Sequence, residues 1–234
     1  MSRPRRLGIL GGTFDPIHVG HLDAAAAAER ALGLDEIWLL PTHVPPHRAV
    51  DPRATPYHRF ALAVAAVADR ATWRVSDLEL SRRGPSYTAD TLRTLAAQGW
   101  APSDLYFILG GDAFADVAAW HDFPTLLDLA HFVVIDRPGA RASDAVRRLP
   151  TIESRLATPT HTRNDGGPTR VFLVEAATRD VSSTAIRRGL ATGDDITTMV
   201  PAPVAAHIRK YHLYGAVDDA HGEHTSPQAR SHHH

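Results

Sequence analysis

The chain has 234 residues, a formal net charge of -1, 44% hydrophobic residues and 22% charged residues. This composition predicts a globular protein with an ordinary core, and the charge argues against a general nucleic-acid or membrane-surface binder, since both need a basic excess. The chain has no cysteine, which excludes disulfides, thiolate metal sites and cysteine nucleophiles. No apolar run approaches the roughly 20 residues of a membrane span, and a strand-like stretch follows the basic N-terminus, so we expect a cytoplasmic protein without a signal peptide.

Apolar runs alternate with helical patterns along the chain. The predicted strands are residues 7–10, 36–40, 73–80, 105–109, 131–135 and 171–174. The predicted helices are residues 19–32, 57–70, 88–97, 113–119, 125–130, 183–190 and 203–211. Residues 140–170 predict one weak helix and a surface loop. We expect a single domain over residues 1–217 and a disordered tail over 218–234, which ends in histidines typical of a partial purification tag.

This alternation predicts an α/β fold, a doubly wound parallel sheet with helices on both faces and the strand order 3-2-1-4-5 plus a sixth strand. In such a sheet the ligand lies at the carboxyl ends of the strands, where the strand order reverses. With this order the reversal falls between the first and fourth strands. Both strands end in a glycine pair, Gly11-Gly12 and Gly110-Gly111. The sequence therefore predicts the site there.

The segment after the first strand has the residues of a phosphate cradle. Glycines let the backbone approach a ligand, and we expect a helix to start near Pro16 or Ile17 with its free N–H groups toward the same place. His18 and His21 are spaced i, i+3 on the first turn, where both can donate hydrogen bonds to phosphate oxygens. Gly20 leaves room between them for a base or ribose.

Other interpretations of these residues stay open. A glycine pair after a strand is often only a turn, and two histidines at this spacing are also half of a metal site. No third ligand is apparent, so we assign no metal site. Asp15 is equally compatible with an N-cap and with a ligand contact.

Two motifs carry a resemblance to a known superfamily. The stretches Gly12-Thr13-Phe14-Asp15-Pro16 and His18-Val19-Gly20-His21 resemble the signature of the nucleotidyltransferases related to class I aminoacyl-tRNA synthetases. The stretch Val181-Ser182-Ser183-Thr184-Ala185-Ile186-Arg187 resembles the Ser-Ser-Thr-x-Ile-Arg motif of adenylyltransferases. Physically it is a helix start with hydroxyl groups and an arginine one turn in, which suits phosphate. The resemblance implies a Rossmann-like form of the predicted sheet.

Further matches narrow the resemblance to bacterial nicotinate-nucleotide adenylyltransferases, over about residues 7–214. The matching stretches are Pro45-Pro46-His47-Arg48, Ser86-Tyr87-Thr88, Asp90-Thr91-Leu92, Gly110-Gly111-Asp112, Trp120 and Arg137-Pro138-Gly139. The chain departs from the family pattern at three positions. Gly111 stands where alanine is frequent, Arg48 where lysine is frequent, and His121 where an aromatic residue commonly follows the tryptophan.

The resemblance implies transfer of an adenylyl group from ATP to nicotinate mononucleotide, which gives nicotinate adenine dinucleotide and pyrophosphate. It implies Mg²⁺ with ATP, and a set of site residues. The catalytic residues would be His18, His21 and Arg187, and ATP would contact Gly11, Gly12, Thr13, Phe14, Gly20, Gly110, Asp112, Ser182, Ser183 and Thr184. The acceptor would contact Arg48, Ser86, Tyr87, Thr88, Trp120, His121 and Arg137.

Three alternatives remain at this point. The chain could be a related adenylyltransferase that uses nicotinamide mononucleotide or phosphopantetheine, or a non-catalytic nucleotide sensor built on the same fold. A cytidylyltransferase would more often carry an Arg-Thr-x-Gly-Ile-Ser-Thr motif, which is absent. Small-molecule partners are expected, without nucleic acid or membrane. The sequence decides neither whether the chain forms a homo-oligomer nor whether the loop around residues 45–53 closes over the substrate.

Overall fold

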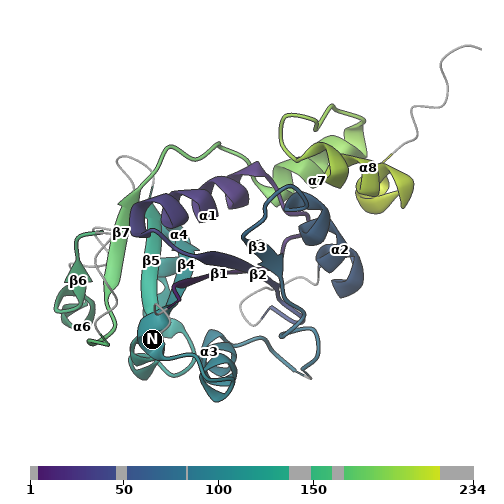
Figure 1. Ribbon diagram of the computed structural model, residues 1–234. Helices are drawn as coiled ribbons and strands as arrows, with labels where there is room; N and C mark the ends of the chain where they lie inside the picture. Colours follow the sequence, from purple (N-terminus) through teal and green to yellow (C-terminus); the bar gives the residue numbers. More distant parts are fainter. Residues whose placement is uncertain (1–4, 46–51, 83, 137–148, 160–165, 217–234) are drawn as a thin grey trace, which may run out of the picture.

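The computed structural model describes residues 5–45, 52–82, 84–136, 149–159 and 166–216. Its centre is one parallel sheet of seven strands in the order β3-β2-β1-β4-β5-β7-β6 (Figure 1). The strands are β1 Leu7–Gly12, β2 Glu36–Pro41, β3 Trp73–Val75, β4 Leu105–Gly110, β5 His131–Asp136, β6 Leu156–Ala157 and β7 Val171–Glu175. The predicted α/β class and the order 3-2-1-4-5 are confirmed, and β7 is the predicted sixth strand.

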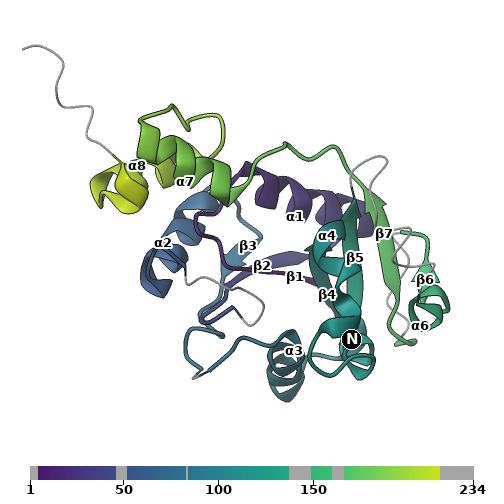
Figure 2. The ribbon, with the colours of Figure 1, turned by 180° about the vertical axis from the view of Figure 1, so that it is seen from behind.

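The central strands are apolar on both faces because helices cover both. Along β4, Tyr106 and Ile108 point into one core, whereas Phe107 and Leu109 point into the other. The first core lies under α1 Val19–Leu32, α2 Pro56–Ala66, α7 Ser183–Thr192 and α8 Ala202–Lys210. The second lies under α3 Thr88–Ala97, α4 Gly111–Ala115 and α6 Pro150–Glu153. Figures 1 and 2 show α1 and α3 on opposite faces of the sheet.

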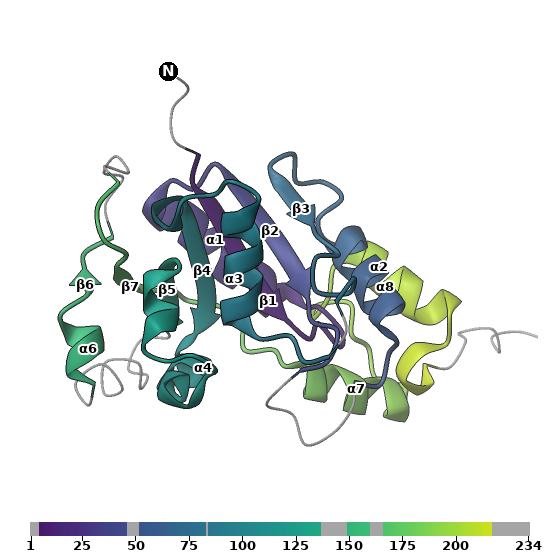
Figure 3. The same cartoon turned by 90° about the horizontal axis from the view of Figure 1, so that it is seen from below.

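Capping signals in the sequence set several helix ends. Gly33 ends α1 in the left-handed conformation, at φ 58°. The Thr55 hydroxyl accepts the N–H of His58 at the start of α2, where Pro56 takes the first helical position. Ser182 caps α7 by accepting the N–H of Ala185 at 3.1 Å. In Figure 3, α2, α7 and α8 lie together beyond the β3 edge of the sheet.

Several sequence-based boundaries were wrong. The helix expected over 57–70 ends at Ala66, and the one expected over 125–130 is a 3₁₀ turn over Thr125–Asp128. The third strand stops at Val75 because residues 77–82 fold into a turn, in which Ser81 N–H bonds to the Asp77 carbonyl. The helix expected over 113–119 is split into α4 and a 3₁₀ turn over Val117–Ala119. The helix predicted over 19–32 is confirmed as α1, whereas the separate expectation that it starts near Pro16 or Ile17 was wrong, because His18 is extended at φ -145° and ψ 171°. The loop expected within 140–170 contains the edge strand β6.

The architecture places a switch point beside β1. This strand pairs with β2 on one side and β4 on the other, so the chain crosses one face of the sheet through α1 and the opposite face through α3. Among the described residues, no helix is long and apolar enough to cross a membrane. The tail expected over 218–234 lies outside the described residues. The single-domain organisation stays a prediction.

Candidate active site

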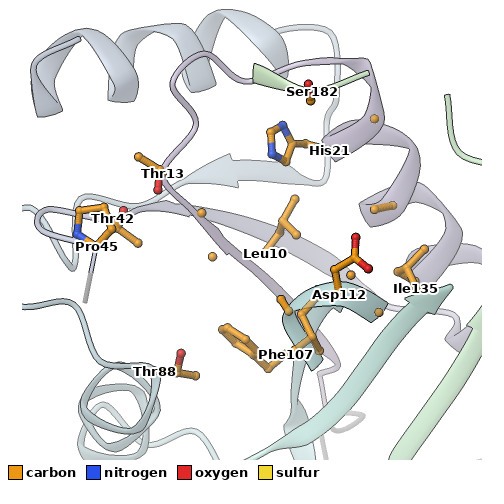
Figure 4. A pocket seen from close by; sticks show the side chains of 18 of the residues that line it. Leu10, Thr13, His21, Thr42, Pro45, Thr88, Phe107, Asp112, Ile135 and Ser182 are labelled. Carbon is orange, nitrogen blue, oxygen red and sulfur yellow. The ribbon is translucent and has the colours of Figure 1, made fainter. Parts of the chain in front are cut away.

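A cavity of about 920 Å³ opens at the carboxyl ends of β1 and β4 (Figure 4). It therefore lies at the predicted switch point. Fourteen of the predicted site residues line it, namely Gly11, Gly12, Thr13, His18, Gly20, His21, Ser86, Tyr87, Thr88, Gly110, Asp112, Trp120, His121 and Ser182. These residues come from segments more than 160 positions apart, so the fold brings both motifs and the predicted acceptor segments to one cavity.

Two glycines of the first motif stand where a side chain would crowd its neighbours. A Cβ at Gly12 would lie 2.7 Å from the Phe14 ring, and one at Gly20 would lie 3.1 Å from Nδ1 of His18 and 3.2 Å from the Arg179 carbonyl. Phe14 itself is buried and packs edge-on against His21, with ring centroids 5.1 Å apart. Its side chain packs beneath the residues of the first motif and does not line the cavity.

His18 and His21 form one unit at the start of α1. Their rings stack with centroids 3.7 Å apart and planes 30° apart. The backbone N–H of His18 donates to Nδ1 of His21 at 3.2 Å. Because Nδ1 of His21 is then the acceptor, a neutral His21 carries its proton on Nε2, where it is a donor. Figure 4 shows the His21 ring at the cavity, near Ser182.

Burial keeps His18 uncharged. Its side chain is almost fully buried and its Nδ1 has no hydrogen-bond partner among the described residues. Desolvation lowers the pKa of His18 from its ordinary 6.5 to about 4, against a smaller opposing effect of the Asp23 carboxylate. At neutral pH, His18 is therefore a neutral imidazole that can donate a hydrogen bond without bringing a full positive charge.

The shifted pKa predicts how stability depends on pH. Below pH 6.5 the unfolded chain protonates His18 while the folded protein stays neutral until about pH 4, so the unfolded state binds more protons and stability falls across this window. We expect the free energy of unfolding to fall by up to about 3 kcal/mol more in the native chain than in His18→Gln. Urea unfolding of both proteins at pH 7 and pH 4.5 measures this difference, and parallel losses would contradict it.

Asp15 holds the first motif to the rest of the protein. Its buried carboxylate accepts the N–H groups of Arg53 at 2.9 Å and Ala54 at 3.0 Å. The hydroxyl of Tyr214 also donates to it at 3.0 Å, and burial raises the pKa of Tyr214, which stays a neutral phenol. The N-cap interpretation of Asp15 was wrong because His18 occupies the N-cap position of α1. Instead, Asp15 connects segments 38 and 199 positions away.

This network predicts a structural effect of Asp15→Asn. The amide would present its NH₂ group to at least one backbone donor and would remove the negative charge beside Arg187, which lies 3.8 Å from the carboxylate. We expect the free energy of unfolding to fall by about 2–4 kcal/mol. Chemical denaturation measures it, with the exposed Asp69→Asn as the control that should change it by less than about 0.5 kcal/mol.

The second motif is fastened to the first by hydrogen bonds. The Ser183 hydroxyl donates to the Pro16 carbonyl at 2.9 Å. Nη1 of Arg187 donates to the Asp15 carbonyl at 2.7 Å, and its Nη2 donates to the Thr184 hydroxyl at 3.1 Å. Ser182 lines the cavity, whereas the side chains of these other three residues do not. In this structure, the start of α7 therefore reaches the cavity mainly through Ser182.

The predicted acceptor segments lie across the cavity from the histidines. His121 stacks on Tyr87 with ring centroids 4.4 Å apart, and Trp120 meets Phe107 edge-on at 6.2 Å. The stacking shows that His121, where the family pattern often has an aromatic residue, still packs as a flat ring. Thr88 is the first residue of α3, whose N-terminus faces the cavity and is not capped by the Tyr87 side chain.

Some expected residues are not placed, and others line the cavity without having been predicted. Arg48 and Arg137 lie outside the described residues. Thr42, Glu79 and the segment 178–181 line the cavity as well. In that segment, Arg179 forms a two-pronged ion pair with Asp23 of α1, which lowers the pKa of Asp23. Burial raises the pKa of Glu79, whose Oε1 accepts the hydroxyl of Thr91 at 2.7 Å. No local pattern marks these residues, since their places depend on distant contacts.

Comparisons with known proteins agree with the geometry. The model of the cytidylyltransferase-like family matches residues 9–189. This match defines the class of protein as cytidylyltransferase-like. A protein of Pseudomonas syringae pv. tomato named "Probable nicotinate-nucleotide adenylyltransferase" is 41% identical over 91% of this chain and 95% of its own. One of the same name from Shewanella frigidimarina is 35% identical over 89% of this chain and 99% of its own. The chain therefore belongs to the nicotinate-nucleotide adenylyltransferase family.

Solved structures support the fold. The nicotinic acid mononucleotide adenylyltransferase of Plasmodium falciparum, complexed with NaAD, superposes with a TM-score of 0.67 at 20% identity. The match covers 90% of this chain and 98% of the other. At this identity, the likeness supports the doubly wound sheet and its strand order, independently of the residues in the cavity.

Proposed function

We propose that the chain transfers the adenylyl group of ATP to nicotinate mononucleotide, which gives nicotinate adenine dinucleotide and pyrophosphate. The observation that carries the proposal is one cavity with the stacked His18–His21 pair on one side and Ser86, Thr88 and Trp120 on the other. A cavity of about 920 Å³ has room for the reacting parts of two nucleotides, while the rest of each nucleotide extends beyond its opening. The names of the relatives agree with this reaction.

The reaction needs no nucleophile from the protein. A phosphate oxygen of the mononucleotide attacks the α-phosphorus of ATP, the bond from the α-phosphorus to the bridging oxygen breaks, and pyrophosphate leaves with that electron pair. Catalysis then consists of positioning and of neutralising the charge that develops on the phosphoryl oxygens. His21, through Nε2–H, and neutral His18 donate to the phosphates, and the start of α7 with Ser182 favours the leaving pyrophosphate.

Arg187 has a structural role in the free protein, and we propose that it also contacts a phosphate when ATP is bound. Its guanidinium holds the Asp15 carbonyl and the Thr184 hydroxyl, and its side chain is 23% exposed. A guanidinium has five donors, so it can keep these contacts and still offer an N–H to a phosphate oxygen at the edge of the cavity. Arg48 and Arg137 remain proposed contacts of the acceptor phosphate.

Magnesium enters with the nucleotide in this proposal. Mg²⁺ prefers oxygen ligands and keeps several waters, and it is commonly held by substrate phosphates with one or two carboxylates. Among the residues that the structure describes, no group of three or more histidine, aspartate or glutamate side chains could hold a metal ion. Asp112 is one of the carboxylates that line the cavity, with Glu79, Asp136 and Asp180, and is the one we propose for a phosphate-bound ion, which would offset charge on the triphosphate.

Pyrophosphate release separates the alternatives. We expect release with ATP and nicotinate mononucleotide, slower release with nicotinamide mononucleotide and none above background with phosphopantetheine. Preference for either of the other acceptors would identify a different adenylyltransferase. ATP binding without pyrophosphate release for any acceptor would identify a nucleotide sensor.

A further inference from the structure

Arg59 is the largest side chain that the described part of the protein buries completely. It projects from α2, a helix that does not itself line the cavity. Removing a guanidinium from water costs several kcal/mol unless well-placed acceptors compensate. A hydrophobic side chain would fill the same space without that cost. The contacts of the guanidinium must therefore account for its presence.

The guanidinium joins two loops that reach the cavity. Its Nη1 donates to the carbonyl of Thr13 at 2.7 Å, in the loop after β1. Its Nη2 donates to the carbonyl of His43 at 3.2 Å, in the loop after β2. The planar fork of arginine fixes the angle between two such bonds, so the two carbonyls are held at a set separation.

His43 extends the connection to the acceptor side. Its backbone N–H donates to the Ser86 hydroxyl at 3.0 Å, and its ring Nδ1 lies 3.0 Å from the Arg82 carbonyl. The N–H of Ser86 in turn donates to the Val44 carbonyl at 2.9 Å. A continuous path therefore runs from Thr13, beside the histidine motif, through Arg59 and His43 to Ser86, which begins the proposed acceptor segment.

We propose that Arg59 is a positioning residue. It sets the spacing between the loop after β1, which contains Thr13 and is proposed to bind ATP, and the proposed acceptor segment that begins at Ser86. The identity of the two substrates rests on the proposed function, whereas the connection itself does not. In-line attack needs the reacting atoms about 3–3.5 Å apart, and a misplacement of about 1 Å costs on the order of 10²-fold in rate. Loss of the bridge should therefore lower kcat and leave the binding of each substrate alone nearly unchanged.

The protein offers a matched control for a buried arginine. Arg6 is also buried, and its Nη1 donates to the Leu32 carbonyl at 2.7 Å. It precedes β1 at the opposite end of the strand from the cavity. Arg6→Met and Arg59→Met should both lower the urea concentration at the unfolding midpoint. Only Arg59→Met should lower kcat, on the order of 10²-fold, with the Kd for ATP changed by less than about threefold.

A second readout needs no substrate. In the ligand-free protein, we expect amide hydrogen exchange at residues 11–14 and 85–88 to be at least about tenfold faster in Arg59→Met and unchanged in Arg6→Met. If Arg59→Met does not fold, Arg59→Lys carries the test, because it keeps the charge and loses the fork. Equal exchange at both segments in the Arg59 and Arg6 variants would overturn the proposal. Turnover of the native protein tests the proposed function separately. The amide-exchange measurement needs no substrate, so it decides the role of Arg59 even if the acceptor is not nicotinate mononucleotide.

Discussion

His21→Ala should lower kcat by on the order of 10²–10³-fold, or roughly 3–4 kcal/mol of transition-state stabilisation. The reason is geometric: the N–H of His18 fixes Nδ1 of His21 as an acceptor, so Nε2–H is a preorganised donor at the cavity. A donor that is already oriented needs no reorganisation when charge develops at the α-phosphorus. The effect should fall on kcat, with the KM for ATP changed much less. Steady-state kinetics with saturating acceptor measures both constants.

Two further variants make the result specific to the donor. His21→Gln places an amide N–H near the position of Nε2, so we expect it to recover part of the lost kcat. His207→Ala removes a histidine of α8 that does not line the cavity, and kcat should stay near the native value. Near-native turnover in His21→Ala, with a folded protein by circular dichroism, would show that His21 is not a transition-state donor.

The second large effect should be discrimination between acid and amide acceptors. Backbone N–H groups at the start of α3 suit the pyridine carboxylate, because a helix N-terminus favours negative charge. An amide in the same place would present its own NH₂ to these donors and leave a buried polar group unpaired. We expect kcat/KM for nicotinate mononucleotide to exceed that for nicotinamide mononucleotide by roughly 10²-fold or more. Competition between the two acceptors in one reaction, with both dinucleotide products quantified, measures the ratio directly.

Trp120→Ala is the matched control for this preference. If the indole stacks on the pyridine ring, its removal should raise KM for both acceptors and leave their ratio nearly unchanged, since stacking does not distinguish acid from amide. Equal kcat/KM for the two acceptors in the native protein would refute the proposed backbone contacts. A ratio that collapses in Trp120→Ala would move the discrimination from the backbone to the tryptophan.

The strand order of the sheet could be predicted because each central strand is a continuous apolar run in the sequence. Continuous apolar runs such as β4 and β5 are typical of strands buried on both faces, and Gly33 and Ser182 mark helix ends. The short strand β3 was overestimated because residues 76–80 keep an alternating pattern while folding into a turn. The apolar pattern predicted the start of α1 at Val19, whereas the expectation of a start near Pro16 or Ile17 was wrong, because His18 adopts an extended conformation as the N-cap although histidine is not a typical N-cap residue.

The cavity was predictable where chemistry is concentrated in a motif and not where it depends on tertiary contacts. His18 and His21 are three positions apart in sequence, and they meet in space as the N-cap residue and the third residue of α1, so their pairing follows from a short local segment. The roles of Asp15 and Arg59 could not be predicted, because an arginine on a helix is usually exposed and an aspartate before a helix is usually a cap. Their partners lie up to 199 positions away, and no local pattern encodes such contacts.

The most direct test of adenylyl transfer in this cavity follows the phosphorus atoms of ATP. The purified chain is incubated with Mg²⁺, nicotinate mononucleotide and ATP that carries ³²P at the α position or at the γ position, and the products are separated. Adenylyl transfer predicts that the α label appears in the dinucleotide and the γ label in pyrophosphate, in equal molar amounts. Release of the α label as AMP, or of the γ label as inorganic phosphate without dinucleotide, would contradict adenylyl transfer in this cavity.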